Sequence, residues 1–423
     1  MTGLHELFEE AVDSPSPPSR LTAEEVYAAG RRRRRRRLAT ATCASAAALA
    51  TIAAAAASLL APGKPVERPP VAGRTIPAVG SDPHVGQLVQ WAGAADANHL
   101  YRAFSTCTGP PPCSKARFQL TGSDDGGHTW SERGTPREIL NLAVLDAGAL
   151  VGVVPPQGQA HGVTTTVMTS TDGARTWTAV QPAAAVHGVP DGSTAICWPQ
   201  ARDGSCALQV VNPGLHQIGA LAEQPPLKAY PPDELVIRKS GGRLWVGGID
   251  PATGRPAAAT SADSGRTWSV HVFADAPPCS SEGCRPPSLA SGGGATVYAV
   301  TEGGSKQAIY RGTAGAGPGG TSWQRLTMAE RIPQRRGLGS FVAGDGTHVL
   351  YQLVDDPDQN TDVYRFWAAR ADGGYESVEL TGLPASAGPI RRTPNGWFYA
   401  LSHADGGLYG STDGWHWSPV TGN

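Results

Sequence analysis

The stretch GSDDGGHTW, Gly122–Trp130, contains a short frame that recurs along the chain. Near copies stand at Thr169–Trp177 (TSTDGARTW) and Thr260–Trp268 (TSADSGRTW), and a shortened copy, STDGWHW, spans Ser411–Trp417. The central aspartates of the four copies follow one another at intervals of 47, 91 and 150 residues. Because these intervals approximate one, two and three units of about 45 to 50 residues, they indicate the four-stranded blades of a β-propeller.

The chain beyond residue 79 shows strand patterning rather than helical periodicity. Short runs rich in Val, Leu, Tyr and Trp alternate with clusters of Gly, Pro, Asp and Ser. Five runs share a pattern that suits the second strand of a blade: NHLYRAF, GRLWVGG, ATVYAV, HVLYQLV and GWFYAL. Alternation places the blades near residues 80–136, 137–182, 183–229, 230–275, 276–328, 329–382 and 383–423. The sequence therefore predicts an all-β, seven-bladed β-propeller, with six or eight blades as alternatives.

The residue types of the frame suit a hairpin turn. A carboxylate can accept unpaired backbone N–H groups there, and glycine takes a backbone conformation that other residues avoid. Ser and Thr hydroxyls bind nearby backbone groups, and the Trp ring packs against a neighbouring sheet. The residues with this structural role are Ser123, Asp125, Gly127, Thr129 and Trp130; Ser170, Asp172, Thr176 and Trp177; Ser261, Asp263, Gly265, Thr267 and Trp268; and Ser411, Asp413 and Trp417.

The pattern S-x-D-x-G-x-T-W resembles the Asp-box, or BNR repeat, of sialidase-like propellers. It is complete in the first and third copies, Ala174 replaces the glycine in the second, and the fourth is one residue short. In that family the boxes lie at the periphery, between the third and fourth strands of a blade. The resemblance therefore implies that the frames mark the fold and lie away from the central funnel.

Two other interpretations of the frame are a calcium loop and a catalytic carboxylate pair. A calcium loop could use Asp124 with Asp125, but the frame lacks a bidentate Glu at the twelfth loop position. Carboxylates at equivalent positions of different blades cannot approach within the roughly 5 to 9.5 Å that glycoside hydrolysis requires. Both interpretations are therefore disfavoured.

The resemblance also implies a possible sialidase site, with three arginines for the sugar carboxylate, a Tyr assisted by Glu as nucleophile, and an Asp as acid/base. Its first arginine belongs to an Arg-Ile-Pro segment before the first box, whereas the RIP of this chain, Arg331–Pro333, follows the third. Candidate tyrosines and glutamates fit core strands or loops instead: Tyr351, Tyr364, Tyr399, Glu234, Glu302 and Glu330. We therefore assign no catalytic, cofactor-binding or metal-ligating residue, and no cofactor.

The N-terminal part of the chain has the features of a membrane anchor. Seven arginines, Arg31–Arg37, precede 24 uncharged residues, Leu38–Ala61, which is enough to cross a bilayer as a helix. Positive flanks stay cytoplasmic. The sequence predicts a cytoplasmic basic tail (1–37), a transmembrane helix (38–61), a Pro-rich linker (62–79) and an extracellular β-propeller (80–423), placing the protein in the plasma membrane as a single-pass protein. A cleaved signal peptide is the alternative.

Six cysteines follow the predicted membrane helix, and this even number favours disulfides in an oxidising compartment. Spacing alone leaves 15 connectivities open. Zinc sites are disfavoured because the spacings are not those of zinc ligands. We expect pairing between sequence neighbours: Cys107 with Cys113, Cys197 with Cys206, and Cys279 with Cys284.

The net charge of −1 excludes a strongly basic, nucleic-acid-binding surface over the whole chain. Low Lys usage beside abundant Arg, Ala, Gly and Pro resembles proteins of high-GC bacteria such as actinobacteria. The sequence favours a non-catalytic, membrane-tethered extracellular propeller that binds a protein, peptide or cell-wall glycan at its funnel face, as a binding or scaffold module. The alternative is an exported sialidase-like glycoside hydrolase of the exo-α-sialidase type.

Overall fold

The computed structural model describes residues 89–420, apart from 108–115, 155–165, 199–203, 233–234, 238, 277, 280–284, 304–305, 316–320, 327–337, 357–360 and 370–373. The predicted tail, membrane helix and linker therefore lie outside the described residues. Within the described ranges no helix is long and apolar enough to cross a membrane.

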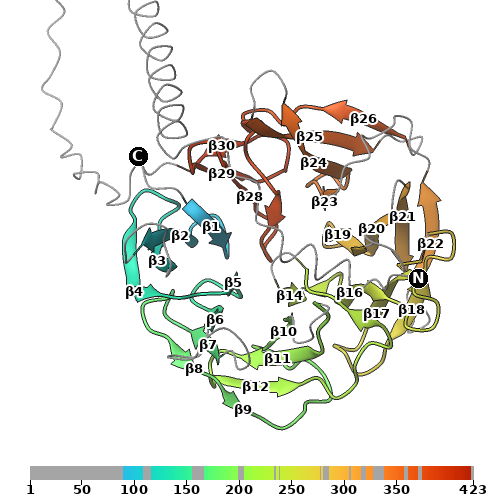
Figure 1. Ribbon diagram of the computed structural model, residues 1–423, viewed down its shortest axis with the longest axis horizontal. Helices are drawn as coiled ribbons and strands as arrows, with labels where there is room; N and C mark the ends of the chain where they lie inside the picture. Colours follow the sequence, from blue (N-terminus) through green and yellow to red (C-terminus); the bar gives the residue numbers. More distant parts are fainter. Residues whose placement is uncertain are drawn as a thin grey trace, which may run out of the picture. The chain divides into compact units, whose positions relative to one another are not determined.

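The described residues form seven β-sheets arranged in a ring (Figure 1), which confirms the predicted seven-bladed propeller. Five sheets each consist of four consecutive strands in antiparallel order. These are blade 1 (β1 Val89–Ala94, β2 Leu100–Cys107, β3 Ala116–Ser123, β4 Ser131–Arg137), blade 2 (β5 Asn141–Val144, β6 Leu150–Val154, β7 Thr166–Ser170, β8 Thr178–Ala179), blade 5 (β19 Arg285–Ser291, β20 Thr296–Gly303, β21 Lys306–Ala314, β22 Thr321–Leu326), blade 6 (β23 Gly339–Val342, β24 His348–Asp356, β25 Thr361–Ala369, β26 Tyr375–Val378) and blade 7 (β27 Arg391–Arg392, β28 Phe398–Leu401, β29 Leu408–Ser411, β30 Ser418–Pro419).

Blades 3 and 4 depart from this order because they share one inner segment. Blade 4 contains β13 (Lys228–Ala229), β16 (Arg243–Ile249), β17 (Pro256–Ser261) and β18 (Ser269–Val272), and β15 (Lys239–Ser240) pairs the other end of β16. Between β13 and β15 the chain forms β14 (Val236–Ile237), which pairs with β10 (Thr194–Cys197) of blade 3. Blade 3 continues outward through β11 (Leu208–Asn212), β12 (Gln217–Ala220) and β9 (Gln181–Pro182).

The sequence assigned residues 183–229 to the third blade, and the structure corrects both ends of that assignment. Ala183–Ala185 are exposed, and Val186 bridges Leu221 on the outer side of the blade. The inner position is filled by Val236 and Ile237, which are 6% and 5% exposed. These branched apolar side chains fill an inner strand better than alanines do, and Figure 1 shows β14 on the inner side of β10, with β9 at the rim.

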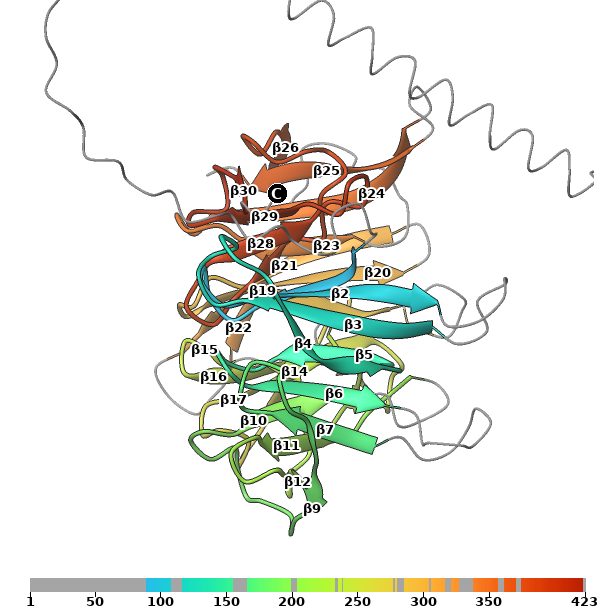
Figure 2. The same cartoon turned by 90° about the vertical axis from the view of Figure 1, so that its left-hand side faces the viewer.

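All five aromatic-centred runs noted in the sequence form second strands, namely β2, β16, β20, β24 and β28. Antiparallel order makes these second strands end at one face of the ring, which we call the loop face. The four frames join third to fourth strands, so they lie at the opposite face, which we call the frame face. Figure 2 shows β2, β6 and β20 pointing toward the same face.

The ring closes between blades 1 and 7 by side-chain packing. Each of these blades is built from its own consecutive strands, so no strand in the described part is exchanged between them. Ala92, Leu100 and Tyr399 are buried in one apolar cluster across the seam. The Arg391 Nη1 group also donates a 2.9 Å hydrogen bond to the carbonyl oxygen of Ala92.

Candidate functional site

The first frame forms a closed hydrogen-bonded turn between β3 and β4. Ser123 Oγ donates to Asp125 Oδ1 at 2.8 Å and accepts the Gly127 N–H at 2.8 Å. The two carboxylate oxygens of Asp125 accept the backbone N–H and the hydroxyl of Thr129 at 2.9 and 2.7 Å. Trp130 Nε1 donates to the Gly127 carbonyl at 3.1 Å. The side chains of Ser123, Asp125, Thr129 and Trp130 therefore all bond within the turn.

The other three frames repeat these bonds with local changes. In the second, Ala174 takes the position of the frame glycine at a φ of 68°, so a non-glycine residue occupies the left-handed region there. In the third, Trp268 Nε1 donates to the carbonyl of Glu223 instead of to its own turn. In the fourth, the His416 ring replaces the threonine hydroxyl beside Asp413 Oδ2, at 2.7 Å.

Hydrogen bonding keeps the frame carboxylates ionised. Burial alone would raise the pKa of Asp125, but bonds from the side chain and backbone of Thr129 and from Ser123 lower its pKa to about 2. The same balance lowers the pKa of Asp263 to about 2 and also lowers the pKa of Asp172 and of Asp413. These carboxylates accept the hydrogen bonds that hold the turns, and none has the raised pKa of a general acid.

Asp124, which a calcium loop would need, is occupied by two arginines. Its Oδ2 accepts bonds from Arg133 of β4 and from Arg175 of the second frame, both at 2.7 Å. The Arg133 side chain is 1% exposed, while Asp124 remains 43% exposed. This carboxylate therefore ties the first two blades together at the frame face.

A cavity of about 980 Å³ lies at the centre of the ring and is bordered by residues of blades 2 to 7. Its lining is mostly aliphatic, proline and aromatic, and includes Tyr230, Trp245, Phe341, Tyr351 and Tyr364. Among the described lining residues there is no Asn, Gln or His. The cavity thus combines apolar surface with Ser, Thr and Tyr hydroxyl groups and with charged side chains.

Strand edges form much of the cavity wall. All seven residues of β19, Arg285–Ser291, border the cavity, as do Leu338–Val342 of blade 6. Successive side chains of a strand point to opposite faces, so an uninterrupted run of lining residues means that the strand presents its edge. β19 and β23 each pair with only one strand in the described part of the chain, and the other edge of each is directed at the cavity. Backbone C=O groups, and N–H groups except at Pro286 and Pro287, are therefore part of the lining.

Charged groups lie at both ends of the cavity. Arg285 and Glu302 are cross-strand partners at the loop-face end, and Glu302 Oε1 accepts the N–H of Leu338 at 2.6 Å. Lys239 and Arg392 line the frame-face end beside the turns that lead into the second strands β16 and β28, and Asp191 lies at the same end just before β10.

Three of the described arginines line this cavity, but their positions do not make a sialidase triad. Arg391 and Arg392 are neighbours on β27 and point apart, because Arg391 donates to the carbonyl of Ala92 in blade 1 and Arg392 to that of Ser291 in blade 5. Arg285 is at the opposite end of β19 from Ser291, roughly 20 Å away at about 3.3 Å per residue. Three guanidinium groups so separated cannot hold one carboxylate.

The tyrosines and glutamates considered from the sequence have separate locations. Tyr351 and Tyr364 line the cavity with ring centroids 6.1 Å apart, whereas Tyr399 is buried at the seam between blades 1 and 7. Glu234, Glu330 and Arg331–Pro333 lie outside the described residues. The cavity residues come from six blades with no shared motif, which is why sequence patterns did not identify them.

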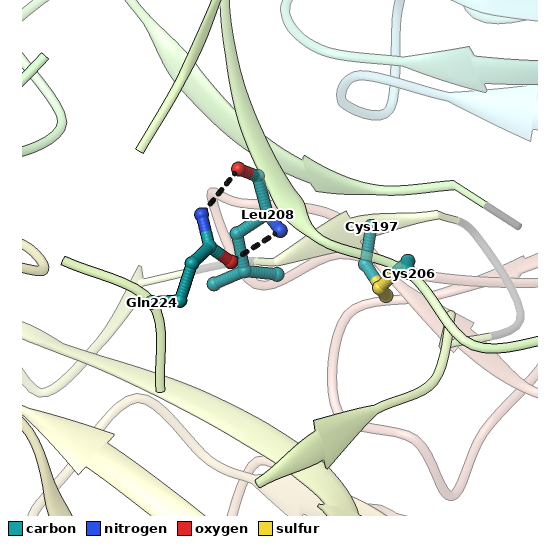
Figure 3. Close-up of a disulfide and its surroundings, with 4 residues drawn as sticks. All are labelled: Cys197, Cys206, Leu208 and Gln224. Carbon is teal, nitrogen blue, oxygen red and sulfur yellow. Dashed lines mark hydrogen bonds between the residues drawn. A yellow bond between two sulfur atoms is a disulfide. The ribbon is translucent and has the colours of Figure 1, made fainter. Parts of the chain in front are cut away.

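The disulfide between Cys197 and Cys206 is present, with 5.5 Å between the Cα atoms, which confirms this predicted pair. Figure 3 shows it beside Leu208, whose N–H and C=O both bond the side-chain amide of Gln224, at 2.8 and 3.0 Å. Cys279 is also disulfide-bonded, while Cys113 and Cys284 lie outside the described residues. Cys107 and Cys197 end second strands, so both lie at the loop face.

Among the described residues no group of three or more His, Cys, Asp and Glu side chains could hold a metal ion.

Comparisons with known proteins connect the chain to a fold. No family model and no curated protein matches it. Similar solved structures include YCF48 from Cyanidioschyzon merolae (14% identity, 77% of this chain and 95% of that chain, TM-score 0.41). Others are the β-propeller domain of the Trilobed protease from Pyrococcus furiosus (8%, 79% and 97%, TM-score 0.43) and TolB from Acinetobacter baumannii (15%, 76% and 79%, TM-score 0.36). The likeness at these identities is one of β-propeller fold alone.

Proposed function

We propose that this protein is a non-catalytic binding module that accepts a polypeptide segment in its central cavity, and that residues 38–61 tether it to the membrane with the propeller outside the cell. We further assign the four frames to the Asp-box type, as structural turns. The binding proposal rests on the structure of the cavity wall. In this wall the edges of β19 and β23 lie beside apolar side chains.

Such a wall suits a polypeptide better than a glycan. Main-chain groups of an extended peptide can pair with a strand edge, while its side chains enter apolar pockets beside the strand. The chemistry of the wall therefore favours a protein or peptide partner.

The loop face is the favoured side of entry. At the frame face, Ser240 Oγ bonds Ser291 Oγ across blades 4 and 5, and Arg392 of blade 7 reaches the carbonyl of Ser291 at 3.3 Å. These contacts narrow that end of the cavity. Leu353, which is 39% exposed, and Tyr364 line the cavity from facing positions of β24 and β25.

Membrane tethering is supported by the sequence and by the disulfide. The Arg31–Arg37 run beside Leu38–Ala61 predicts a helix with its N-terminus inside the cell. A disulfide such as Cys197–Cys206 persists in an oxidising compartment. Protease added to intact cells should degrade the propeller while leaving an epitope tag at residue 1 protected; the reverse pattern would contradict this orientation.

Peptide binding can be tested with the full-length protein in detergent micelles, immobilised and exposed to a library of random heptapeptides. We expect retained peptides, and we expect Leu353→Glu to reduce their retention by about tenfold or more, because binding would bury a carboxylate among apolar groups. Leu215→Glu is the matched control, since Leu215 is 64% exposed and does not line the cavity. Equal loss in both variants, or no retention by the unaltered protein, would overturn the proposal.

The alternative function, a sialidase-like glycoside hydrolase, is suggested by the frame resemblance. It requires converging arginines, and those of the cavity point to different blades. Release of the fluorophore from a fluorogenic sialoside by the purified protein, lost on Tyr351→Phe or Tyr364→Phe, would establish it in place of the binding proposal.

A further inference from the structure

We infer that the cavity recognises the C-terminal end of its polypeptide partner, with the terminal carboxylate held between Lys239 and Arg392 at the frame-face end. This inference rests on the proposed peptide-binding function and deepens it. It rests on the charged side chains of the cavity, because peptide binding by apolar side chains and strand edges alone would not require them.

Arg392 is a half-buried cation without an anionic partner in the described part of the chain. Its Nη1 donates to the Ser291 carbonyl at 3.3 Å and its Nε to the Gly396 carbonyl at 3.5 Å, both long bonds. Its guanidinium carbon lies 5.3 Å from the centroid of the Phe398 ring. Burial lowers the pKa of Arg392, and no acidic group offsets that effect. A carboxylate beside this guanidinium would gain a charge-assisted bond that neutral carbonyls do not supply.

Lys239 provides a second cation at the same end. It lies on β15, next to the turn at Gly241, and lines the cavity with an exposed side chain. Its ammonium group forms no ion pair or hydrogen bond with the part of the chain that the structure describes. The adjoining Ser240 bonds Ser291, whose carbonyl Arg392 contacts. Both cations therefore lie at the frame-face end of the cavity.

The described lining residues carry more positive than negative charge. Four of them are cationic (Lys239, Arg285, Arg391 and Arg392) and two are anionic, with Asp191 at the frame-face end and Glu302 at the loop-face end. Of the anionic pair, Glu302 is at the loop-face end and already accepts the Leu338 N–H. An excess of positive charge in a protein of net charge −1 favours an anionic ligand at this site.

The length of the cavity fits an extended chain end. β19 borders the cavity over its seven residues, so the distance between its two ends is roughly 20 Å. About six or seven extended residues entering from the loop face would bring their last carboxylate to the frame-face end. An internal loop of a partner would have to pass two chains through the same space, and it would bring no terminal charge.

The test compares two random heptapeptide libraries, both N-acetylated, that end in a free carboxylate or in a carboxamide. Full-length protein in detergent micelles is immobilised, and retained peptides are quantified by mass spectrometry. We expect about tenfold greater retention of the carboxylate library at low salt, since a charge-assisted hydrogen bond is stronger than one to a neutral amide. The preference should fall in 0.5 M salt because of screening.

Lys239→Gln should remove most of the preference for the carboxylate library, and Arg392→Gln should also reduce it. Lys228→Gln is the matched control, because Lys228 precedes Lys239 on the same inner segment but does not line the cavity. If Arg392→Gln does not fold, the result for Lys239→Gln alone tests the assignment of the carboxylate site.

Two outcomes separate the inference from the proposed function. Equal retention of the two libraries, with both lost in Leu353→Glu, would overturn the carboxylate assignment and leave peptide binding in place. Retention that is unaffected by Leu353→Glu, or absent for both libraries, would overturn the proposed function together with this inference. Unchanged preference in Lys239→Gln and Arg392→Gln would remove these residues from the site.

Discussion

At the scale of single residues, the frame aspartates hold turns rather than perform chemistry. Asp125→Ala removes the acceptor of bonds from Ser123 and Thr129, so we expect the free energy of unfolding to fall by about 1–2 kcal/mol. Asp125→Asn keeps one acceptor oxygen and should lose less. Urea denaturation of the three proteins measures this order. Loss of peptide retention by Asp125→Ala at unchanged stability would assign Asp125 to binding instead.

The stabilisation from Asp125 also has a defined pH dependence. Its pKa is about 2 in the folded protein and 3.8 is its ordinary value. Its contribution should therefore be complete above pH 3.8 and disappear as the pH falls through 2, because only the unfolded chain takes up a proton between these values.

His348 makes the interface of blades 5 and 6 sensitive to acid at higher pH. The ring is fully buried, stacks on Tyr298 at 4.0 Å and lies 2.6 Å from the Tyr375 hydroxyl. Burial lowers the pKa of His348 from 6.5 to about 3. Between these values the unfolded state binds a proton that the folded state does not, so unfolding becomes easier as the pH falls below 6.5.

We expect this histidine to add a slope of up to about 1.4 kcal/mol per pH unit to the free energy of unfolding between pH 6.5 and 3. Denaturant titrations across that range should show a shallower slope for His348→Phe. His187→Phe, which removes an exposed histidine, should keep the steep slope. Identical slopes for the unaltered protein and His348→Phe would contradict the prediction.

At the scale of elements, the segment that blades 3 and 4 share contains a residue in an unusual conformation. Leu235, just before β14, has a φ of 62° and is 8% exposed among Val153 and Trp198. A side chain in the left-handed region costs about 1–2 kcal/mol, which glycine avoids. Alanine and glycine both remove the buried leucine side chain.

We therefore expect Leu235→Gly to be more stable than Leu235→Ala by about 1 kcal/mol, the reverse of their usual order in regular structure. Thermal unfolding of the two variants, both compared with the unaltered protein, gives the answer. A more stable Leu235→Ala would show that the backbone at this position is not strained.

The fold also shows which features local sequence patterns can predict and which they cannot. The frames and the second strands are local, since Ser123, Asp125 and Thr129 bond within one turn, and contiguous residues therefore revealed the blades. The exchange of an inner strand between blades 3 and 4 depends on Val236 fitting beside Val151 and Ile196, far away in the chain. No single stretch of the sequence indicates which distant side chains will pack together in this way.

At the scale of the whole molecule, the structural turns and the candidate binding cavity occupy different parts of the ring. The frame face carries tight turns and inter-blade bonds such as Arg175 to Asp124, while the Cys197–Cys206 disulfide lies at the loop face. The cavity between them is assembled from blades 2 to 7, with lining residues separated by tens of positions in sequence. Only the closed ring brings its strand edges, apolar groups and cations together, so the sequence could predict the propeller without locating the site.

The central claim is that a peptide binds along the inner-strand edges. Amide hydrogen exchange, measured by mass spectrometry on the full-length protein with and without its best-retained heptapeptide, tests this most directly. We predict slower exchange in Arg285–Ser291 and Gly339–Val342 on binding, with exchange in the frame turns, such as 124–130, unchanged. Slower exchange at the outer strands or the frame turns, with the inner strands unaffected, would contradict the account.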